Sequence, residues 1–253
     1  MKIFTITKNK GYLIGIIFWI VVWQLVSMKL GQEILLVSPV SVIKRLFQLS
    51  VEAEFWIAIS HTFIKIVGGF FIAFILGIIV AIIAYYNKFI KFLIEPLVLT
   101  VQSIPVASFI ILCLVWISSK DLSIFISFLM VFPIIYRNVI NGIENIPKGM
   151  EEMATVFKVT KFKKIRYIYL SYVIPYIKSA CNISLGLCWK AGIAAEVIGI
   201  PSNTIGEKLY NAKIYLDTPD LFAWTLVIII ISFAYQKVFI LLIDYICDRL
   251  ETR

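Results

Sequence analysis

Long uninterrupted apolar stretches constrain the fold of this chain more than any other feature. The segment from Ile64 to Tyr86 reads IKIVGGFFIAFILGIIVAIIAYY and carries a single charge. A helix needs about 20 predominantly apolar residues to cross the hydrocarbon core of a bilayer. Hydrophobic residues make up 61% of the 253 residues, compared with about 45–50% in ordinary soluble domains. The sequence therefore indicates a chain whose solvent is largely lipid.

Six such stretches predict about six transmembrane helices. Open sheet edges are not tolerated in lipid, so the expected fold is all-α, a polytopic membrane helical bundle. One of these stretches, Tyr172–Ile200, is long enough to cross the membrane but contains two charged residues, Lys190 and Glu196. The six predicted spans are Tyr12–Leu30, Ile64–Tyr86, Leu97–Ile117, Leu122–Ile140, Tyr172–Ile200 and Leu221–Ile246.

The chain is expected to form one membrane domain over residues 1–253, with a core at about 60–250 and an extra N-terminal span at 12–30. No repeat with a period of 20–50 residues and no low-complexity linker divides it. The apolar run of the first span is long for a signal peptide. No small-residue cleavage site follows it in SMKLGQE, so we expect a retained anchor.

The net charge of +9 is explained by orientation. With six spans and a cytoplasmic N-terminus, fourteen of the 24 Lys and Arg residues fall on the cytoplasmic side, six on the outer side and four within spans. This asymmetry follows the positive-inside rule for a protein of the plasma membrane. The basic balance therefore needs no nucleic-acid partner.

The sequence shows no sign of a catalytic, cofactor or metal site. It contains no P-loop, no HExxH, no G-x-S-x-G and no DxDxDG loop. The single histidine, His61, cannot build a metal site and reads as an interfacial polar residue. The four cysteines lie in or beside apolar blocks without a CxxC spacing and read as small packing residues: Cys113, Cys181, Cys188 and Cys247.

Two prolines mark a start or a break of helical structure. Pro39 lies between the first two predicted spans, and Pro105 lies within the third. Ser38 followed by Pro39 predicts a helix start, with an N-cap oxygen and a proline at the first helical position. Val40, Ile43, Leu46 and Phe47 then share one face of a short helix, which predicts an interfacial amphipathic segment. Pro105 must break or kink the third span. Irregular backbone at membrane depth needs protein or a water-filled cavity beside it, so packing and cavity lining both stay open.

The longest predicted cytoplasmic segment, about 141–171, is polar and basic. Glu151 and Glu152 lie in the first turn of a predicted helix, where acids suit the helix dipole. Ala154, Phe157 and Lys161 share a face, and a second helix is predicted to begin near Lys161. A helix–turn–helix on the cytoplasmic surface is suited to a groove on a peripheral partner.

Here the sequence resembles the transmembrane permease subunits of ATP-binding-cassette importers. Their cytoplasmic loop carries Glu-Ala-Ala, a glycine four residues after the second alanine, and later Leu-Pro. Glu152-Met153-Ala154 occupies the Glu-Ala-Ala place, and Lys158 occupies the glycine place. A lysine there argues against the tight turn that is usual between the two loop helices, because Lys is costlier than Gly at positive φ. Leu170-Ser171 and Pro175 match the later positions.

Three further segments resemble the sulfonate, nitrate and taurine branch of that family. They are LVSPVSV, IEPLVLTVQSIPVASF and GIAAEVIG, and with the loop they lie in register from Leu36 to Leu250. The resemblance implies a non-catalytic subunit that binds no cofactor, forms a homodimer, and works with separate ATPase subunits that hydrolyse ATP and with an extracellular solute-binding protein. It also implies a coupling loop that docks on the ATPase through Glu152, Ala154, Phe157, Lys158 and Lys161.

The intramembrane charges are candidates for the translocation pathway, together with Pro105. Lys190 and Glu196 are six residues apart and cannot form a direct i,i+4 pair. Charges at bilayer depth usually face the bundle interior or a cavity. Lys190 facing the pathway favours a small organic or inorganic anion; the alternatives are an ion pair with Asp244 or Glu95, or a snorkelling side chain. For Glu196 the alternative is a packing role near the outer surface.

A second class of function also stays open at this point. A stand-alone, gradient-driven carrier or a small integral membrane enzyme would need no ATPase. Such a carrier favours inverted repeats or paired intramembrane acids, and neither is evident in the sequence.

Overall fold

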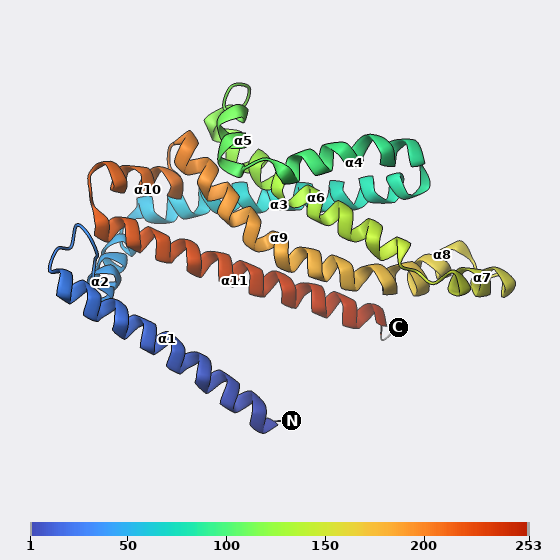
Figure 1. Ribbon diagram of the computed structural model, residues 1–253, viewed down its shortest axis with the longest axis horizontal. Coiled ribbons are helices and arrows are strands. Elements are labelled where there is room, and N and C mark those ends of the chain that lie inside the picture. Colours follow the sequence, from blue (N-terminus) through green and yellow to red (C-terminus); the bar gives the residue numbers. More distant parts are fainter. Residues whose placement is uncertain (1, 252–253) are drawn as a thin grey trace.

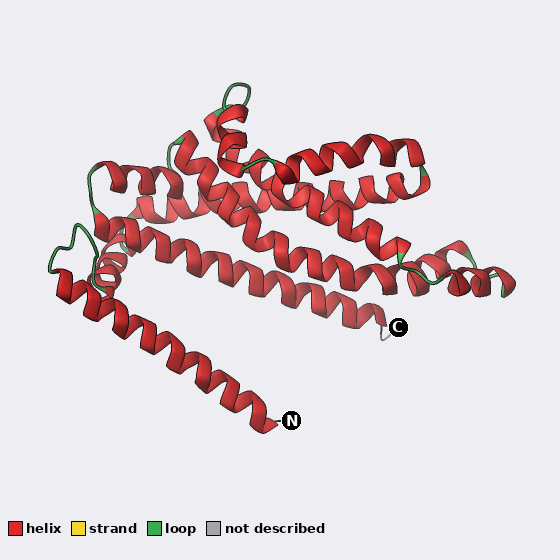
Figure 2. Cartoon of the chain, in the orientation of Figure 1, coloured by secondary structure: helices red, strands yellow, loops and turns green. Residues whose placement is uncertain are grey.

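The computed structural model describes the backbone of residues 2–251 and the side chains of residues 14–245 and 249. Over the described backbone the chain is helical apart from short turns and contains no strand (Figure 2). The elements are α1 (Lys2–Leu30), α2 (Pro39–Ser50), α3 (Ala53–Tyr86), α4 (Lys88–Ser103), α5 (Val106–Cys113), α6 (Ser119–Glu144), α7 (Lys148–Val156), α8 (Lys161–Lys164), the π-helix η1 (Ile165–Tyr169), α9 (Leu170–Gly199), α10 (Ile205–Ile214) and α11 (Thr218–Glu251).

Helix α6 is the centre of the bundle and makes its most extensive contacts with α9 and α3. Helix α11 runs alongside α9, and α1 diverges from the other helices (Figure 1). Helices α2 and α10 lie at one end of the molecule, and α7 and α8 lie at the opposite end (Figure 1). The fold is thus an all-α polytopic membrane bundle, as the sequence predicts.

The membrane-spanning helices differ in part from the six predicted spans. Within the described residues, α3, α6, residues 161–199 and the part of α11 up to Tyr245 are long and apolar enough to cross a bilayer. The N-terminal apolar helix is shorter in its described part, Ile14–Leu30. The block Leu97–Ile117, which was expected to be one span, falls in α4, α5 and the turn after α5. Helices α4 and α5 are bent by 109° and amount to one span only if the bent pair is counted as a broken span.

The bend between α4 and α5 lies at Pro105, as predicted for that residue. Helix α4 ends at Ser103, Ile104 is extended (φ −82°, ψ 132°), and α5 begins directly after Pro105. A proline ring clashes with a helical conformation of the preceding residue, which explains the extended Ile104. The predicted break is therefore confirmed, and it is large enough to turn the chain rather than kink it.

Helix α2 begins as its sequence predicts. The Ser38 side-chain oxygen accepts a hydrogen bond from the Ser41 N–H at 3.1 Å, and Pro39 is at the first helical position. Of the predicted apolar face, Val40, Ile43 and Phe47 are exposed, whereas Leu46 packs against the buried core, as do Val42 and Leu49. The three exposed side chains are available to the membrane interface, as an interfacial helix requires.

An ion pair fixes α2 against α11. The Arg45 Nε donates a hydrogen bond to the Asp220 carboxylate. This bond raises the pKa of the Arg45 guanidinium above its ordinary value.

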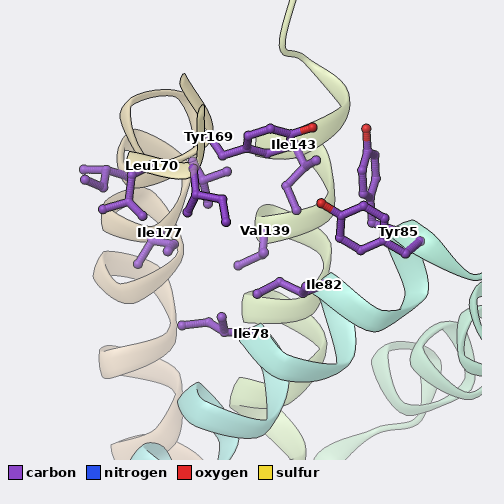
Figure 3. A pocket seen from close by; sticks show the side chains of 12 residues that line it. Ile78, Ile82, Tyr85, Val139, Ile143, Tyr169, Leu170 and Ile177 are labelled. Atoms are coloured by element: carbon purple, nitrogen blue, oxygen red, sulfur yellow. The ribbon is translucent and has the colours of Figure 1, made fainter. Parts of the chain in front are cut away.

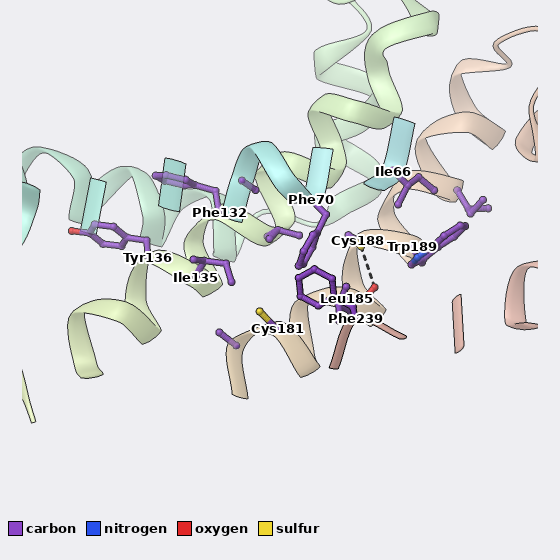
Figure 4. Close-up of a cluster of buried hydrophobic side chains, with 14 of the residues drawn as sticks. Ile66, Phe70, Phe132, Ile135, Tyr136, Cys181, Leu185, Cys188, Trp189 and Phe239 are labelled. Atoms are coloured by element: carbon purple, nitrogen blue, oxygen red, sulfur yellow. Dashed lines mark hydrogen bonds between the residues drawn. The ribbon is translucent and has the colours of Figure 1, made fainter. Parts of the chain in front are cut away.

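Most of the buried core is apolar and aromatic, and it includes two of the cysteines. Phe70 and Phe239 pack edge-to-face with ring centroids 5.0 Å apart and join α3 to α11 (Figure 4). Cys181 and Cys188 are free and buried within this cluster, and Cys113, the last residue of α5, is buried in a second cluster. The packing role predicted for these three is confirmed; the side chain of Cys247 lies outside the described residues.

The crossing of α3 and α6 predicts opposite effects for two adjacent glycines. A Cβ atom on Gly69 would lie 2.4 Å from the Ile124 carbonyl oxygen, whereas one on Gly68 meets nothing within 4 Å. We expect Gly69→Ala to lower the free energy of unfolding by about 1–3 kcal/mol through overpacking. Gly68→Ala is expected to raise it by about 0.5–1 kcal/mol because alanine loses less backbone entropy. Thermal unfolding in detergent measures both, and equal effects of the two variants would contradict the close crossing.

Candidate functional site

A helical loop projects from the bundle at the end opposite α2 and α10. Pro147 precedes α7, and α7 ends at Val156. The N–H of the next residue, Phe157, donates to the Met153 and Thr155 carbonyls. The Val159 N–H donates to the Ala154 carbonyl at 2.9 Å, and the Lys158 N–H donates to the Thr155 carbonyl at 3.1 Å. This pair of bonds is a Schellman motif, which satisfies carbonyls at a helix C-terminus. The loop between α7 and α8 is therefore a defined turn.

Lys158 forms this tight turn in the left-handed conformation, with a φ of 48°. The expectation that a lysine argues against the tight turn is wrong. A left-handed L-residue costs about 1–2 kcal/mol, and the two backbone bonds of the cap offset this cost. The lysine thus occupies the position at which glycine is usual without changing the shape of the turn.

Ala154 points into the loop rather than away from it. Its side chain is 2% exposed and belongs to the same buried cluster as Ile146 and Ile168. Phe157 and Lys161, which were expected to share its face, are exposed. The difference arises because α7 ends at Val156, so that the regular helical projection does not extend to these two residues. Packing within the chain accounts for the small side chain at position 154.

The outward surface of the loop is strongly apolar. Val156, Phe157 and Phe162 are 76%, 75% and 73% exposed. Glu152 and Lys158 are exposed on the same loop. Sequence reasoning missed Val156 and Phe162, although large apolar residues in a basic segment that leaves the membrane were the available signal. Exposed apolar patches rimmed by polar residues mark interaction sites.

The loop is tied to the bundle through Glu151, the neighbour of the predicted Glu152. The Tyr169 hydroxyl donates to Glu151 Oε1 at 2.6 Å, and Lys164 Nζ lies 3.8 Å from the same oxygen. These bonds join α7 to η1 and α8. The outer face of the loop is therefore displayed from an anchored base.

Lys190 lies within α9 on an exposed stripe. Its neighbours Trp189 and Ala191 are 2% and 5% exposed, whereas Lys190 itself is exposed together with Ile183 and Leu187. No hydrogen-bond or ion-pair partner of Lys190 occurs among the side chains that the structure describes.

The two acids considered as partners for Lys190 have other surroundings. Asp244 pairs with Lys178, with Nζ and Oδ1 2.5 Å apart. Glu95 is exposed on α4. Neither acid forms a described ion pair with Lys190.

Glu196 is completely buried near the end of α9. Its Oε2 accepts hydrogen bonds from the Thr62 hydroxyl at 2.8 Å and from the Gly206 N–H at 3.3 Å. Thr62 Oγ1 accepts in turn from the Ile205 N–H at 3.0 Å. The carboxylate thus joins α9, α3 and the start of α10. This arrangement matches the packing alternative, and a role of Glu196 in the pathway stays a prediction.

No described contact joins the three residues predicted for a pathway, but α5 lies between the corner at Pro105 and α9. Pro105 is exposed at the corner between α4 and α5. From that corner α5 packs on α9, where Ile110 and Cys113 belong to one buried cluster with Ala191 and Ala195. The bent segment therefore lies against the stretch of α9 between Lys190 and Glu196.

No metal site accompanies these groups. Among residues 14–245 and 249, no group of three or more His, Cys, Asp or Glu side chains is placed to hold a metal ion.

These features define a multi-pass membrane protein with an anchored helical loop whose outward surface is apolar. Residues 73–253 match the family described as "Binding-protein-dependent transport system inner membrane component", and the chain belongs to this family. It is therefore a non-catalytic permease subunit of an ATP-binding-cassette importer, whose ATPase is a separate subunit. Membership in this family implies an ATPase and a binding protein as partners. It argues against the alternative function considered from the sequence, a stand-alone carrier or a small membrane enzyme.

Three relatives illustrate the similarity. The chain is 30% identical over 160 residues to the bicarbonate transport system permease protein CmpB of Synechococcus elongatus, covering 62% of this chain and 57% of that protein. It is 26% identical over 199 residues to the nitrate import permease protein NrtB of the same species, covering 74% and 71%. It is 22% identical over 220 residues to the taurine transport system permease protein TauC of Escherichia coli, covering 85% and 80%.

The left-handed Lys158 leads to a prediction about the turn. We expect Lys158→Gly to keep transport and to raise the free energy of unfolding by up to about 1 kcal/mol, because the relief of left-handed strain exceeds the added entropy of the unfolded chain. Lys158→Ala is the control, since it removes the charge but keeps the Cβ atom and should bring no gain. Chemical unfolding of both variants measures the difference; a gain from alanine as large as that from glycine would show that charge, not backbone strain, is relieved.

Proposed function

We propose that this permease forms a homodimer whose central pathway carries a small organic or inorganic anion into the cell. We further propose that α7 and α8 are the coupling helices and dock on the ATPase, which hydrolyses the ATP. The N-terminus and the α7–α8 end are then cytoplasmic, in agreement with the distribution of Lys and Arg along the chain.

The observation that carries the anion proposal is the exposed, unpaired Lys190 on a membrane-spanning helix. A lysine at the helix centre costs about 2.5–3.5 kcal/mol on insertion scales, so it is expected to face water or a partner. The exposed stripe of Ile183, Leu187 and Lys190 provides a face on which a second copy can pack. Two copies of Lys190 on a shared cavity would attract an anion.

The names of the relatives support the same substrate class. Bicarbonate and nitrate are small anions, and taurine carries a sulfonate group. Lys190 is the residue of this chain that we assign to recognise such a group. Pro105 is proposed to line the same pathway, because its corner is exposed and α5 packs beside Lys190. Glu196 is retained as a pathway candidate, to be tested against its packing role.

The coupling proposal is supported by the anchored loop and its apolar surface. Phe157, Lys158, Lys161 and Glu152 are exposed on it, so they are available to a groove on the ATPase. Ala154 is assigned to the same interface indirectly, since it sets the packing of the loop from inside.

Substitution of Lys190 tests the anion pathway. We expect Lys190→Met to leave the complex assembled with basal ATPase activity, while uptake of the anion falls at least about tenfold because the charge is lost. Lys190→Arg is expected to restore part of the uptake. Lys237→Met is the matched control, since Lys237 is an exposed lysine on another span, α11, and its loss should leave uptake unchanged.

The measurement is uptake into proteoliposomes that contain permease, ATPase and binding protein, with bicarbonate, nitrate and taurine as probes. Loss of assembly in Lys190→Met would instead support a buried ion pair, because an orphaned buried acid is strongly destabilising. Full uptake with normal assembly would assign Lys190 to the lipid-facing surface.

Substitution of Phe157 tests the coupling interface. A charged residue at the centre of an apolar interface is expected to weaken binding of the ATPase by about 2 kcal/mol or more, roughly 30-fold. Phe157→Asp should therefore release the ATPase during purification while the permease stays in the membrane. Tyr215→Asp is the control, since Tyr215 is 80% exposed near the opposite end of the bundle. Retention of the ATPase by Phe157→Asp would remove this residue from the interface.

A further inference from the structure

An apolar cavity of about 260 Å³ opens at the α7–α8 end of the bundle. It lies between the last turns of α3, the last half of α6 and the first turns of α9 (Figure 3). It is separate from the face of Lys190 and from the outer surface of the α7–α8 loop. The lining residues are Ile78, Ile82, Tyr85, Tyr86, Val139, Ile143, Ile165, Tyr169, Leu170, Val173, Ile174 and Ile177.

The chemistry of the wall suits hydrocarbon. Nine of the twelve lining side chains are Ile, Leu or Val, and the polar groups of the remaining three are tyrosine hydroxyls. In Figure 3, Tyr85 and Tyr169 lie at one end of the cavity, with Ile78 at the other. Apolar cavities of this kind stay dry and take up apolar molecules. Tyrosines at the mouth are typical of the depth at which lipid headgroups begin.

Cations and a carboxylate lie near the tyrosine end of the cavity. Lys164 Nζ lies 5.7 Å from the centre of the Tyr169 ring and 3.8 Å from Glu151 Oε1, which also accepts the hydrogen bond of the Tyr169 hydroxyl. Arg166 follows the lining residue Ile165 and precedes Leu170 by one turn. Its Nε is buried and has no hydrogen-bond partner in the described part of the chain. Arg166 does not itself line the cavity, and the centre of its guanidinium group lies 5.7 Å from the centre of the Tyr167 ring. Its buried Nε without an acceptor can still donate a hydrogen bond to an anionic group.

The cavity wall includes the one π-helical turn of the described backbone, Ile165–Tyr169. Such turns occur frequently at functional sites. Here the turn supplies two lining residues, Ile165 and Tyr169, and also carries Arg166. The apolar wall and the unpaired cation are thus built by the same irregular segment.

We propose that this cavity binds one acyl chain of an anionic phospholipid, with the phosphate held by Arg166 and Lys164. The occupant is a lipid because the cavity opens at the ends of three spans. Its headgroup is anionic because residues 161–166 carry four Lys and Arg side chains, which outnumber the nearby carboxylates of Glu151 and Glu144. The site also reaches the loop, since the hydroxyl of the lining residue Tyr169 binds Glu151 of α7. A bound lipid would therefore stabilise the base of the α7–α8 loop.

The test compares lipid retention in the assembled complex. The complex of permease and ATPase is purified from nanodiscs that contain equal amounts of palmitoyl-oleoyl phosphatidylglycerol and the phosphatidylcholine of the same chains. Retained lipid is then counted by native mass spectrometry. We expect the wild type to retain phosphatidylglycerol in roughly 10- to 30-fold preference, from two cations near one anionic headgroup.

Two variants separate the headgroup from the chain. Arg166→Gln is expected to remove most of the preference for phosphatidylglycerol, whereas Lys237→Gln, a cation control on α11, should preserve it. Ile174→Trp fills the cavity and is expected to exclude both lipids, whereas Ile229→Trp on α11 should retain them. If Ile174→Trp fails to fold, the result for Arg166→Gln still decides the proposal.

Three outcomes would overturn the site. The first is equal retention of the two lipids by the wild type, and the second is an unchanged preference in Arg166→Gln. The third is a complex without retained lipid in which the cavity is covered by the second copy or the ATPase. Each is distinct from a failure of the transport proposal, because no uptake is measured.

Discussion

Close contact of α6 with α3 and α9 is the constraint on which the rest of the structure depends. Lipid is as apolar as leucine, so helices in a bilayer associate through tight packing rather than through the hydrophobic effect. Glycines supply this approach at both crossings. A Cβ atom on Gly69 would lie 2.4 Å from the Ile124 carbonyl oxygen of α6, and one on Gly192 of α9 would lie 2.7 Å from the Ser127 hydroxyl oxygen of α6. The close-packed trio then provides a rigid frame for the less regular parts.

Those irregular parts are where the chain meets its surroundings. The corner at Pro105 brings α5 against α9, and the anchored loop displays Phe157 and Phe162 at the opposite end. Movement of the loop relative to the bundle would be transmitted through Glu151 and the first turns of α9, because the hydrogen bond from Tyr169 joins these two parts. The close-packed helices are thus distinct from the two irregular parts for which we propose contacts with other molecules.

The sequence predicts the features that depend on neighbouring residues and misses those that depend on distant ones. The start of α2 at Ser38 and Pro39, the break at Pro105 and the helix pair α7 and α8 all follow from local stereochemistry. The inward direction of Ala154 depends on where α7 ends and on Ile168, which lies in a later element. The partner of Glu196 is Thr62, 134 residues away, and no local pattern indicates it. The left-handed Lys158 was misjudged because the backbone bonds of the turn outweigh the preference of the side chain.

The Glu196 network also has a consequence for the order in which the protein is built. Its donors come from α3, near the beginning of the bundle, and from α10, which is synthesised after α9. The Glu196 Oε2 atom therefore gains both of its donors only once α9 lies beside α3 and the chain has turned back at Ile200, whose φ is 49°. Until then the nascent bundle carries a carboxylate with unmet hydrogen bonds among apolar side chains, which is a costly state. Closure of α10 is thus the step that completes the α2–α10 end of the bundle during biosynthesis.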